Sequence, residues 1–307
     1  MPNSFVSLAD YSTEELRKLI ELAHDLKRNP RAYKDACEGQ TLAMIFQKPS
    51  LRTRVSFQTG IYQLGGQGLY LGPTDIQLHR GETIADTARV LSRYVDGIMA
   101  RVFGHEDIVD LAVNAEVPVI NGLSDFNHPC QVLADLQTVS EKFGRLEGLK
   151  LTYIGDGNNM AHSIMYGCAK MGMHVAIGHP KGYAPDPTVA TRTREFASVH
   201  GSAVQVTEDP IEAVTDADVV YTDVWTSMGQ EKEAAERLKR FEGFEVNSAM
   251  MASAKPSAIF MHCLPAHRGE EVSAEVIDGP RSVVFDEAEN RLHAQKAIMI
   301  SLMGRKH

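Results

Sequence analysis

The sequence predicts an α/β protein built from two doubly wound parallel-sheet domains that are joined by interdomain helices. Short apolar runs alternate along the chain with segments whose apolar residues recur at helical spacing, which is typical of a parallel sheet flanked by helices. At 307 residues the chain is long enough for two hydrophobic cores. Residues 144–148, Gly-Arg-Leu-Glu-Gly, have the composition of a hinge between the halves.

The N-terminal half begins with a helix. Ser12 and Glu15 have the spacing of a capping box, and Asn29-Pro30 ends the helical pattern that follows. Next comes the apolar run 41–46, a buried strand, and then a helix that runs from Arg52 to the pair Gly65-Gly66. The later elements of this half are strands at 68–71, 97–100 and 117–120, a polar loop at 72–83, and helices at 83–94, 106–115 and 128–143.

The C-terminal half repeats the alternation. Its predicted strands lie at 149–154, 174–177, 204–206, 219–223, 259–263 and 283–285, with a helix at 162–170 after the first strand. A final amphipathic helix covers about residues 289–303. We therefore expect domains at residues 1–143 and 144–288, followed by a terminal helical segment at 289–307.

Composition excludes several classes of protein. Hydrophobic residues make up 43% of the chain and charged residues 23%, and the formal net charge of −9 argues against nucleic acid or an anionic membrane as the main partner. No apolar stretch approaches transmembrane length, and the N-terminus lacks a signal-peptide pattern. Cys37, Cys130, Cys168 and Cys263 show neither metal-type nor disulfide-framework spacing, so we expect a reduced, cytoplasmic setting.

One stretch predicts an anion site. After the strand at 41–46, Pro49 breaks the pattern, and Ser50, Arg52, Thr53 and Arg54 stand at the start of the next helix. Unpaired helix N–H groups, hydroxyls and guanidiniums together suit a phosphate-like dianion. The alternative is a capped surface helix with solvated arginines. Arg101 and Asn121-Gly122 also follow predicted strands, so we expect them to converge with Ser50 at one sheet edge.

Other polar groups stand at strand ends and helix starts. His128 and Gln131, in His128-Pro129-Cys130-Gln131, lie one helical turn apart and can face the same ligand. The C-terminal half adds three such groups, at residues 223–229, 262–265 and 286–291. For Cys263 the alternative is a buried small apolar residue. The segment 155–160 resembles the start of a dinucleotide fingerprint, but Met160 stands where its third glycine would be.

Together these motifs resemble those of the ornithine carbamoyltransferases. The resemblance rests on Ser50-Leu51-Arg52-Thr53-Arg54, His128-Pro129-Cys130-Gln131, Asp223 with Ser227-Met228-Gly229, and His262-Cys263-Leu264-Pro265. The first two motifs are shared with aspartate carbamoyltransferases, whereas the last two are similar to the ornithine branch. Aspartate enzymes carry a catalytic lysine in the loop around Gln77. This chain has His79-Arg80 there, which argues against aspartate as substrate.

The resemblance implies an activity, an oligomeric state and a separate substrate for each domain. Residues 1–143 would bind carbamoyl phosphate, residues 144–288 would bind L-ornithine, and the helix at 289–307 would pack back on the first domain. The reaction would give L-citrulline and phosphate in arginine biosynthesis, with neither metal nor organic cofactor. The assembly would be a homotrimer, or a multiple of trimers, in which the Gln77 loop reaches a neighbouring subunit.

The resemblance also implies a role for each motif residue. The catalytic residues would be Arg52, Arg101, His128, Asp223 and Cys263. Carbamoyl phosphate would be bound by Ser50, Leu51, Arg52, Thr53, Gln77, Arg101, His128, Pro129, Cys130, Gln131, Cys263, Leu264 and Arg291. Ornithine would be bound by Asn159, Asp223, Ser227 and Met228.

Four alternatives remain open at the level of sequence. The acceptor could be putrescine, acetylornithine or another amine, or the enzyme could serve arginine breakdown. The third alternative is a nicotinamide-dependent oxidoreductase, which the two doubly wound halves and Gly155-x-Gly157 would allow. The fourth alternative is a catalytically silent binding protein, although the presence of Arg52, His128, Asp223 and Cys263 argues against it.

Overall fold

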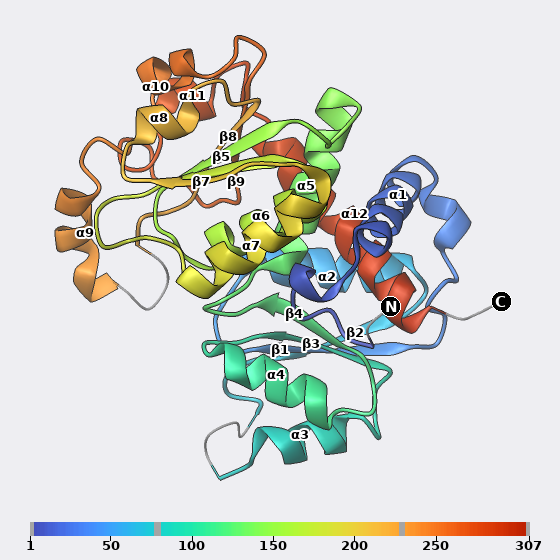
Figure 1. Ribbon diagram of the computed structural model, residues 1–307. Helices are drawn as coiled ribbons and strands as arrows, with labels where there is room; N and C mark the ends of the chain where they lie inside the picture. The colour runs from blue at the N-terminus through green and yellow to red at the C-terminus, as the bar shows by residue number, and fades with distance from the viewer. Residues whose placement is uncertain (1–2, 77–80, 227–230, 305–307) are drawn as a thin grey trace. The chain divides into compact units, whose positions relative to one another are not determined.

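The computed structural model describes residues 3–76, 81–226 and 231–304, which form two compact units (Figure 1). Unit 1 comprises Met1–Gln137 together with Glu289–His307, and unit 2 comprises Thr138–Ala288. Two helices cross the division, α5 (Pro129–Phe143) and α12 (Val284–Met303). The predicted class of two parallel-sheet α/β domains joined by helices is confirmed. The predicted domain limits, after residues 143 and 288, stay a prediction.

Unit 1 is a four-stranded parallel sheet in the order β2-β1-β3-β4. Figure 1 shows α3 and α4 on one face of the sheet and α1 and α2 on the other. The elements are α1 (Thr13–Arg28), β1 (Thr41–Phe46), α2 (Leu51–Gln63), β2 (Gln67–Leu71), α3 (Ile84–Leu91), β3 (Gly97–Arg101), α4 (His105–Asn114) and β4 (Val119–Leu123), with short 3-10 turns at Leu8–Asp10 and Pro30–Tyr33.

Local sequence signals account for the first helix. The Ser12 hydroxyl accepts a hydrogen bond from the Glu15 N–H, and the Glu15 carboxylate accepts one from the Ser12 N–H, so the predicted capping box is present. The apolar residues at helical spacing form the buried face of α1: Leu16, Leu19, Ile20, Ala23 and Leu26. β1 is buried along almost its whole length, as a central parallel strand should be.

Unit 2 is a five-stranded parallel sheet in the order β7-β6-β5-β8-β9. Figure 1 shows α6 and α7 on one face and α8, α10 and α11 on the other. The elements are β5 (Lys150–Ile154), α6 (Asn159–Lys170), β6 (His174–Gly178), α7 (Pro187–His200), β7 (Val204–Thr207), α8 (Pro210–Val214), β8 (Val219–Thr222), a 3-10 turn at Glu231–Glu233, α9 (Ala234–Arg240), α10 (Ser248–Ser253), β9 (Ile259–His262) and α11 (Ala274–Ile277).

Two local predictions are wrong. The segment 283–285 is the start of α12 and not a strand, since the Val283 carbonyl accepts a helical hydrogen bond from the Glu287 N–H. Acidic residues in that first turn favour a helix N-terminus. Asn121 and Gly122 lie within β4 and not after it, and the Asn121 amide donates to the Val6 carbonyl. Asn121 is fully buried within the strand.

The two sheets place their strand ends where ligands bind in doubly wound folds. In unit 1 the direction of winding reverses between β1 and β3, and in unit 2 between β5 and β8. Ligands of open α/β sheets bind beyond the carboxyl ends of the strands at such a reversal. Within the described ranges, no helix combines the length and the apolar character needed to cross a membrane.

A close contact within the chain explains why residue 157, in the incomplete dinucleotide fingerprint after β5, is a glycine. Its N–H donates to the Tyr183 carbonyl, and a Cβ at this position would lie 2.2 Å from the Pro185 nitrogen and 2.4 Å from the Ala184 carbonyl carbon. In a dinucleotide site the second glycine lets the backbone approach a pyrophosphate. Here the close approach is taken by the chain itself, so Gly155-x-Gly157 lends no support to the oxidoreductase alternative.

We expect Gly157→Ala to destabilise unit 2, because the neighbouring atoms are backbone and cannot move aside without distorting the fold. The loss should be about 1–3 kcal/mol or more in free energy of unfolding. Urea denaturation followed by the fluorescence of Trp225, the only tryptophan of the chain, measures it within the same unit. The control is Val199→Ala on the exposed side of α7, which should change stability by less than about 0.5 kcal/mol. Equal midpoints for the two variants would contradict the steric argument.

Candidate active site

The start of α2 has the features of an anion-binding site. Ser50 caps the helix with an extended backbone, and its hydroxyl accepts a hydrogen bond from the Thr53 N–H at 3.3 Å. The Leu51 side chain is 75% exposed, whereas the Thr53 side chain is buried. The other N–H groups of this first turn have no partner one helical turn earlier, and the helix dipole favours negative charge here. Leu51 therefore offers its main chain, and not its side chain, to a ligand.

Arg101 lies at the carboxyl end of the neighbouring strand. The parallel register pairs Phe46 of β1 with Arg101 of β3, and the Gln47 N–H donates to the Arg101 carbonyl at 2.9 Å. Arg101 is 5% exposed. Because β1 leads directly to the start of α2, the sheet register brings a second arginine to the loop that carries Ser50.

His128 stands just before α5 and is surrounded by positive charge. Burial lowers its pKa well below the ordinary value for histidine, and the guanidiniums of Arg291, Arg101 and Arg52 lower the pKa further. The imidazole is therefore neutral at physiological pH. A neutral imidazole can donate one hydrogen bond to a carbonyl oxygen without adding a charge of its own.

Arg291 reaches this cluster from α12. Its guanidinium donates to the Gln131 amide oxygen at 2.6 Å and to the Thr53 hydroxyl at 3.0 Å, and all three side chains are buried. The predicted residues from α2, α5 and α12 thus come together within unit 1. Hydrogen bonds of this kind fix a guanidinium in one orientation.

Cys130 is hydrogen-bonded through its thiol to the main chain of β4. Its thiol donates to the Asn121 carbonyl of β4 at 3.3 Å, and burial raises the thiol pKa to about 12. A thiol of that pKa is a poor nucleophile at neutral pH. Its contribution to a ligand site is therefore confined to its main chain, at the first turn of α5, where Pro129 supplies no N–H.

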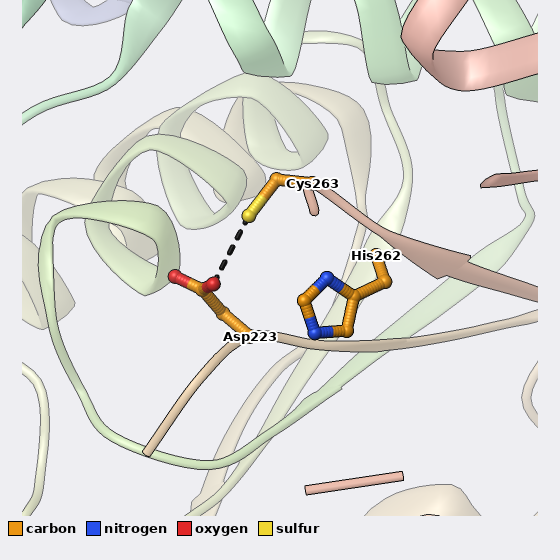
Figure 2. Close-up of side chains that lie close together, drawn as sticks. All are labelled: Asp223, His262 and Cys263. Carbon is orange, nitrogen blue, oxygen red and sulfur yellow. Dashed lines mark hydrogen bonds between the residues drawn. The ribbon is translucent and has the colours of Figure 1, made fainter. Parts of the chain in front are cut away.

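Unit 2 presents an acid and a thiol together. Parallel pairing of β8 with β9 sets Thr222 beside His262, so the next residues, Asp223 and Cys263, emerge side by side. Figure 2 shows the Cys263 thiol directed at the Asp223 carboxylate, to which it donates at 3.0 Å. Asp223 is 8% exposed, and its carboxylate also accepts from the Val224 N–H. A largely buried carboxylate at a strand end suits a cationic or amine ligand.

His262, which the sequence analysis did not assign to the site, anchors this turn. Its Nδ1 accepts a hydrogen bond from the Leu264 N–H at 2.8 Å, so Nε2 carries the proton and faces the buried Glu271 carboxylate at 3.2 Å. The His262 N–H donates to Glu287 at 2.9 Å. The His-Cys-Leu-Pro motif was the signal for this residue, but its role depends on Glu271 and Glu287, which lie outside the motif.

Asp223, His262 and Cys263 offer ligand atoms within 4.8 Å of one another, which is close enough for a shared metal ion. Both imidazole nitrogens, however, face partners within the protein, and the thiol faces the carboxylate. These side chains thus interact with the protein itself, and we assign no metal to them.

Of the remaining predicted ornithine contacts, Asn159 lies within the described residues. Asn159 is the first residue of α6, directly after the cap residue Asn158, whose side chain accepts from the N–H groups of Met160 and Ala161. Leu264 adopts a positive φ of 57° in the turn after β9. The predictions for Gln77, Ser227 and Met228 lie outside the described residues. Nearby, the Arg237 guanidinium bridges the Asp156 carboxylate and the Trp225 carbonyl, each at 2.8 Å.

Comparison with known proteins identifies both units. Residues 3–141 match the family model of the aspartate/ornithine carbamoyltransferase carbamoyl-P binding domain, and residues 147–302 match that of the Asp/Orn binding domain. The chain is 61% identical over 299 residues to the ornithine carbamoyltransferase of Thermococcus kodakarensis, a match that covers 97% of this chain and 95% of that protein.

Relatives from Pyrococcus furiosus extend the match to a solved structure. A protein named ornithine carbamoyltransferase, anabolic, is 57% identical over 97% of this chain and 95% of its own length. The solved ornithine carbamoyltransferase from this organism has a TM-score of 0.95 at 56% identity, and the match covers 98% of this chain and 96% of that one. With both family models and nearly full-length relatives in agreement, the chain belongs to the aspartate/ornithine carbamoyltransferase family.

Proposed function

We propose that this protein transfers the carbamoyl group of carbamoyl phosphate to the δ-amine of L-ornithine, which gives L-citrulline and phosphate. The observation that carries the proposal is the 61% identity, over 97% of the chain, to a protein named ornithine carbamoyltransferase. The relative named anabolic favours arginine biosynthesis over arginine breakdown. The His-Cys-Leu-Pro turn and the Ser-Met-Gly sequence favour ornithine over putrescine or acetylornithine.

In this proposal unit 1 holds carbamoyl phosphate. Ser50, Leu51, Arg52 and Thr53 at the start of α2, with Arg101, bind the phosphate group. Their N–H groups and guanidiniums stabilise the negative charge that develops on phosphate as the C–O bond breaks. The cluster is prepared for that charge before substrate arrives, because Arg101 and Arg291 are already buried and Arg291 is already hydrogen-bonded.

The carbamoyl group would be held by His128 and Gln131, with Gln77 and the backbone around Cys263 and Leu264 completing its contacts. His128 acts here as a neutral hydrogen-bond donor, since burial and the surrounding guanidiniums keep its pKa low. Polarising the carbonyl oxygen makes the carbamoyl carbon more electrophilic. Arg291 supports both groups, because it contacts Gln131 on α5 and Thr53 on α2.

Unit 2 would hold ornithine through Asn159, Asp223, Ser227 and Met228. Attack requires the δ-amine in its neutral form, so the site must accept a proton from it. The Asp223 carboxylate and the Cys263 thiol, 3.0 Å apart, lie together for that transfer. In the overall step the amine nitrogen forms the C–N bond, the C–O bond to phosphate breaks, and one proton is released. The activated leaving group is part of the substrate, so we propose no cofactor.

We also propose a cytoplasmic location. All four cysteines are free thiols, and three of them are buried. Free thiols in place of disulfides are the usual state of proteins in a reducing compartment.

The proposed activity is tested by a colorimetric citrulline assay on the purified protein with carbamoyl phosphate and L-ornithine. We expect citrulline and phosphate in equal amounts, and little product when putrescine, acetylornithine or L-aspartate replaces ornithine. Heat-denatured protein is the control. No citrulline above that control at saturating substrates would refute the proposal, and a higher rate with another amine would reassign the acceptor.

Arg52→Ala should lower kcat by a factor of about 10²–10³, the usual loss when one donor to a developing oxyanion is removed. The matched control is Arg54→Ala, two positions along the same helix. The sequence pattern grouped Arg54 with Arg52, but Arg54 is exposed and its guanidinium lies over the Tyr70 ring, 3.8 Å from the ring centre, so we assign it no contact with phosphate. We expect its loss to leave kcat within experimental error. Steady-state kinetics with both substrates measure this, and equal effects of the two variants would show that Arg52 is misassigned.

A homotrimer is proposed from the family resemblance and from an uncovered apolar surface on unit 1. On α2 and the edge strand β2, four large apolar side chains are exposed: Leu51, Val55, Tyr62 and Leu69. Tyr62 also lines a surface hollow of about 520 Å³ beside Gly66 and Gly68. Exposed apolar patches with an open strand edge are typical of interfaces. We propose that a second copy of the chain covers this surface.

Tyr62→Asp should therefore reduce the molar mass in solution from that of three chains towards that of one. A carboxylate introduced into an apolar contact must lose its hydration, which disfavours association. Light scattering coupled to size-exclusion chromatography measures the mass. Val199→Asp on α7, where the side chain is 78% exposed, is the control and should keep the parent mass. A Tyr62→Asp protein with unchanged mass would place the interface elsewhere.

A further inference from the structure

A buried carboxylate on α5 lies behind the anion site. Asp135 is 1% exposed, and its Oδ1 accepts a hydrogen bond from the Gln131 amide nitrogen at 2.8 Å. The two residues are four positions apart on the helix, so their side chains share one face. Asp135 was not among the residues that the sequence motifs pointed to, and its distance from Arg291 in sequence hides the connection.

The hydrogen bonds continue from Asp135 to the start of α2. Gln131 accepts from Arg291 at 2.6 Å, and Arg291 donates to Thr53 at 3.0 Å. The order of donors and acceptors fixes the amide of Gln131. An ionised carboxylate only accepts, so it must face the amide nitrogen, and the amide oxygen is then directed at the guanidinium. A flipped amide would set two donors against each other at Arg291 and two acceptors at Asp135.

We propose that Asp135 is a positioning residue for the carbamoyl phosphate site: through the Gln131 amide, it holds the Arg291 guanidinium against Thr53 at the N-terminus of α2. The assignment rests on the proposed function, which it deepens by naming a residue that acts without touching substrate. Asp135 is thereby the carboxylate end of a hydrogen-bonded chain that runs through Gln131 to the buried guanidinium of Arg291.

Two physical effects of removing the carboxylate have opposite signs, which makes the proposal testable. By charge alone, Asp135→Asn removes an anion near an anion site and should strengthen the binding of phosphate. By positioning, the variant frees the Gln131 amide to rotate and loosens Arg291, which should weaken binding. A residue that only supports the fold would leave the affinity of the folded protein unchanged.

The first experiment is isothermal titration of the full-length protein with inorganic phosphate, the product of the proposed reaction. We expect Asp135→Asn to raise the dissociation constant about tenfold, the usual scale for a lost hydrogen bond to a charged group. In an Arg291→Ala background the same substitution should have no further effect, because its influence passes through Arg291. Tighter or unchanged binding in Asp135→Asn, or an equal loss in both backgrounds, would overturn the proposal.

Kinetics provide the second measurement. Asp135→Asn should raise KM for carbamoyl phosphate and lower kcat, with KM for ornithine unchanged, whereas partial unfolding would lower the apparent kcat alone. The control is Asp218→Asn, a buried aspartate of unit 2 that pairs with Lys255 at 2.8 Å and precedes β8. It should lose stability and keep both KM values.

A replacement variant and a comparison with the citrulline assay complete the test. If Asp135→Asn does not fold, Asp135→Glu takes its place in the titration, because it keeps the charge but moves the carboxylate by one methylene. We expect weaker phosphate binding in that variant as well, and unchanged binding would overturn the proposal. If the wild-type protein forms no citrulline but Asp135→Asn still binds phosphate more weakly than wild type, the proposed reaction is refuted and the positioning role is retained. Failure of the wild-type protein to bind phosphate would overturn the positioning role, whereas the reaction is decided by the citrulline assay alone.

Discussion

The burial of like charges in unit 1 is the constraint on which the site depends. Arg101 and Arg291 are nearly inaccessible to solvent and, with Arg52, lie close enough to His128 to lower its pKa. A buried guanidinium without partners is costly, and several together repel one another. Arg291 is stabilised by acceptors on two other helices, Gln131 on α5 and Thr53 on α2. The fold thus maintains a concentration of positive charge in a chain whose formal net charge is −9, and a dianionic ligand would relieve it.

Strand register delivers the remaining groups. Pairing of Phe46 with Arg101 sets an arginine beside the loop that leads into α2, and pairing of Thr222 with His262 sets Asp223 beside Cys263. In both units these candidate site residues are the last of their strand or the first after it. A slip by one residue would turn these side chains to the other face of the sheet. The buried apolar residues that fix the register of each strand therefore also fix the geometry of the chemistry.

Much of this was accessible from sequence because its signals are local. Alternating apolar runs predicted the strands, and Ser12 with Glu15 predicted the start of α1. The segment 283–285 was misassigned, because a short apolar run does not distinguish a strand from the buried start of a helix. The motifs pointed to candidate site residues in each unit, but the side chains that contact these residues could not be recognised from the sequence. The roles of Glu271 and Glu287 depend on their contacts with His262 in the folded chain. The role of Asp135 depends on the hydrogen bond by which Arg291 of α12 reaches Gln131.

The charges of the two units also bear on the choice of substrate. Unit 1 gathers guanidiniums, whereas unit 2 presents the buried carboxylate of Asp223 with a thiol that donates to it. A carboxylate in such a place attracts an amine and repels an acidic group. In the proposed function Asp223 faces the acceptor, where aspartate would bring a second carboxylate and ornithine brings a second amine. Asp223 would then discriminate by repulsion as well as by attraction. This electrostatic preference is consistent with the names of the relatives, which are ornithine carbamoyltransferases.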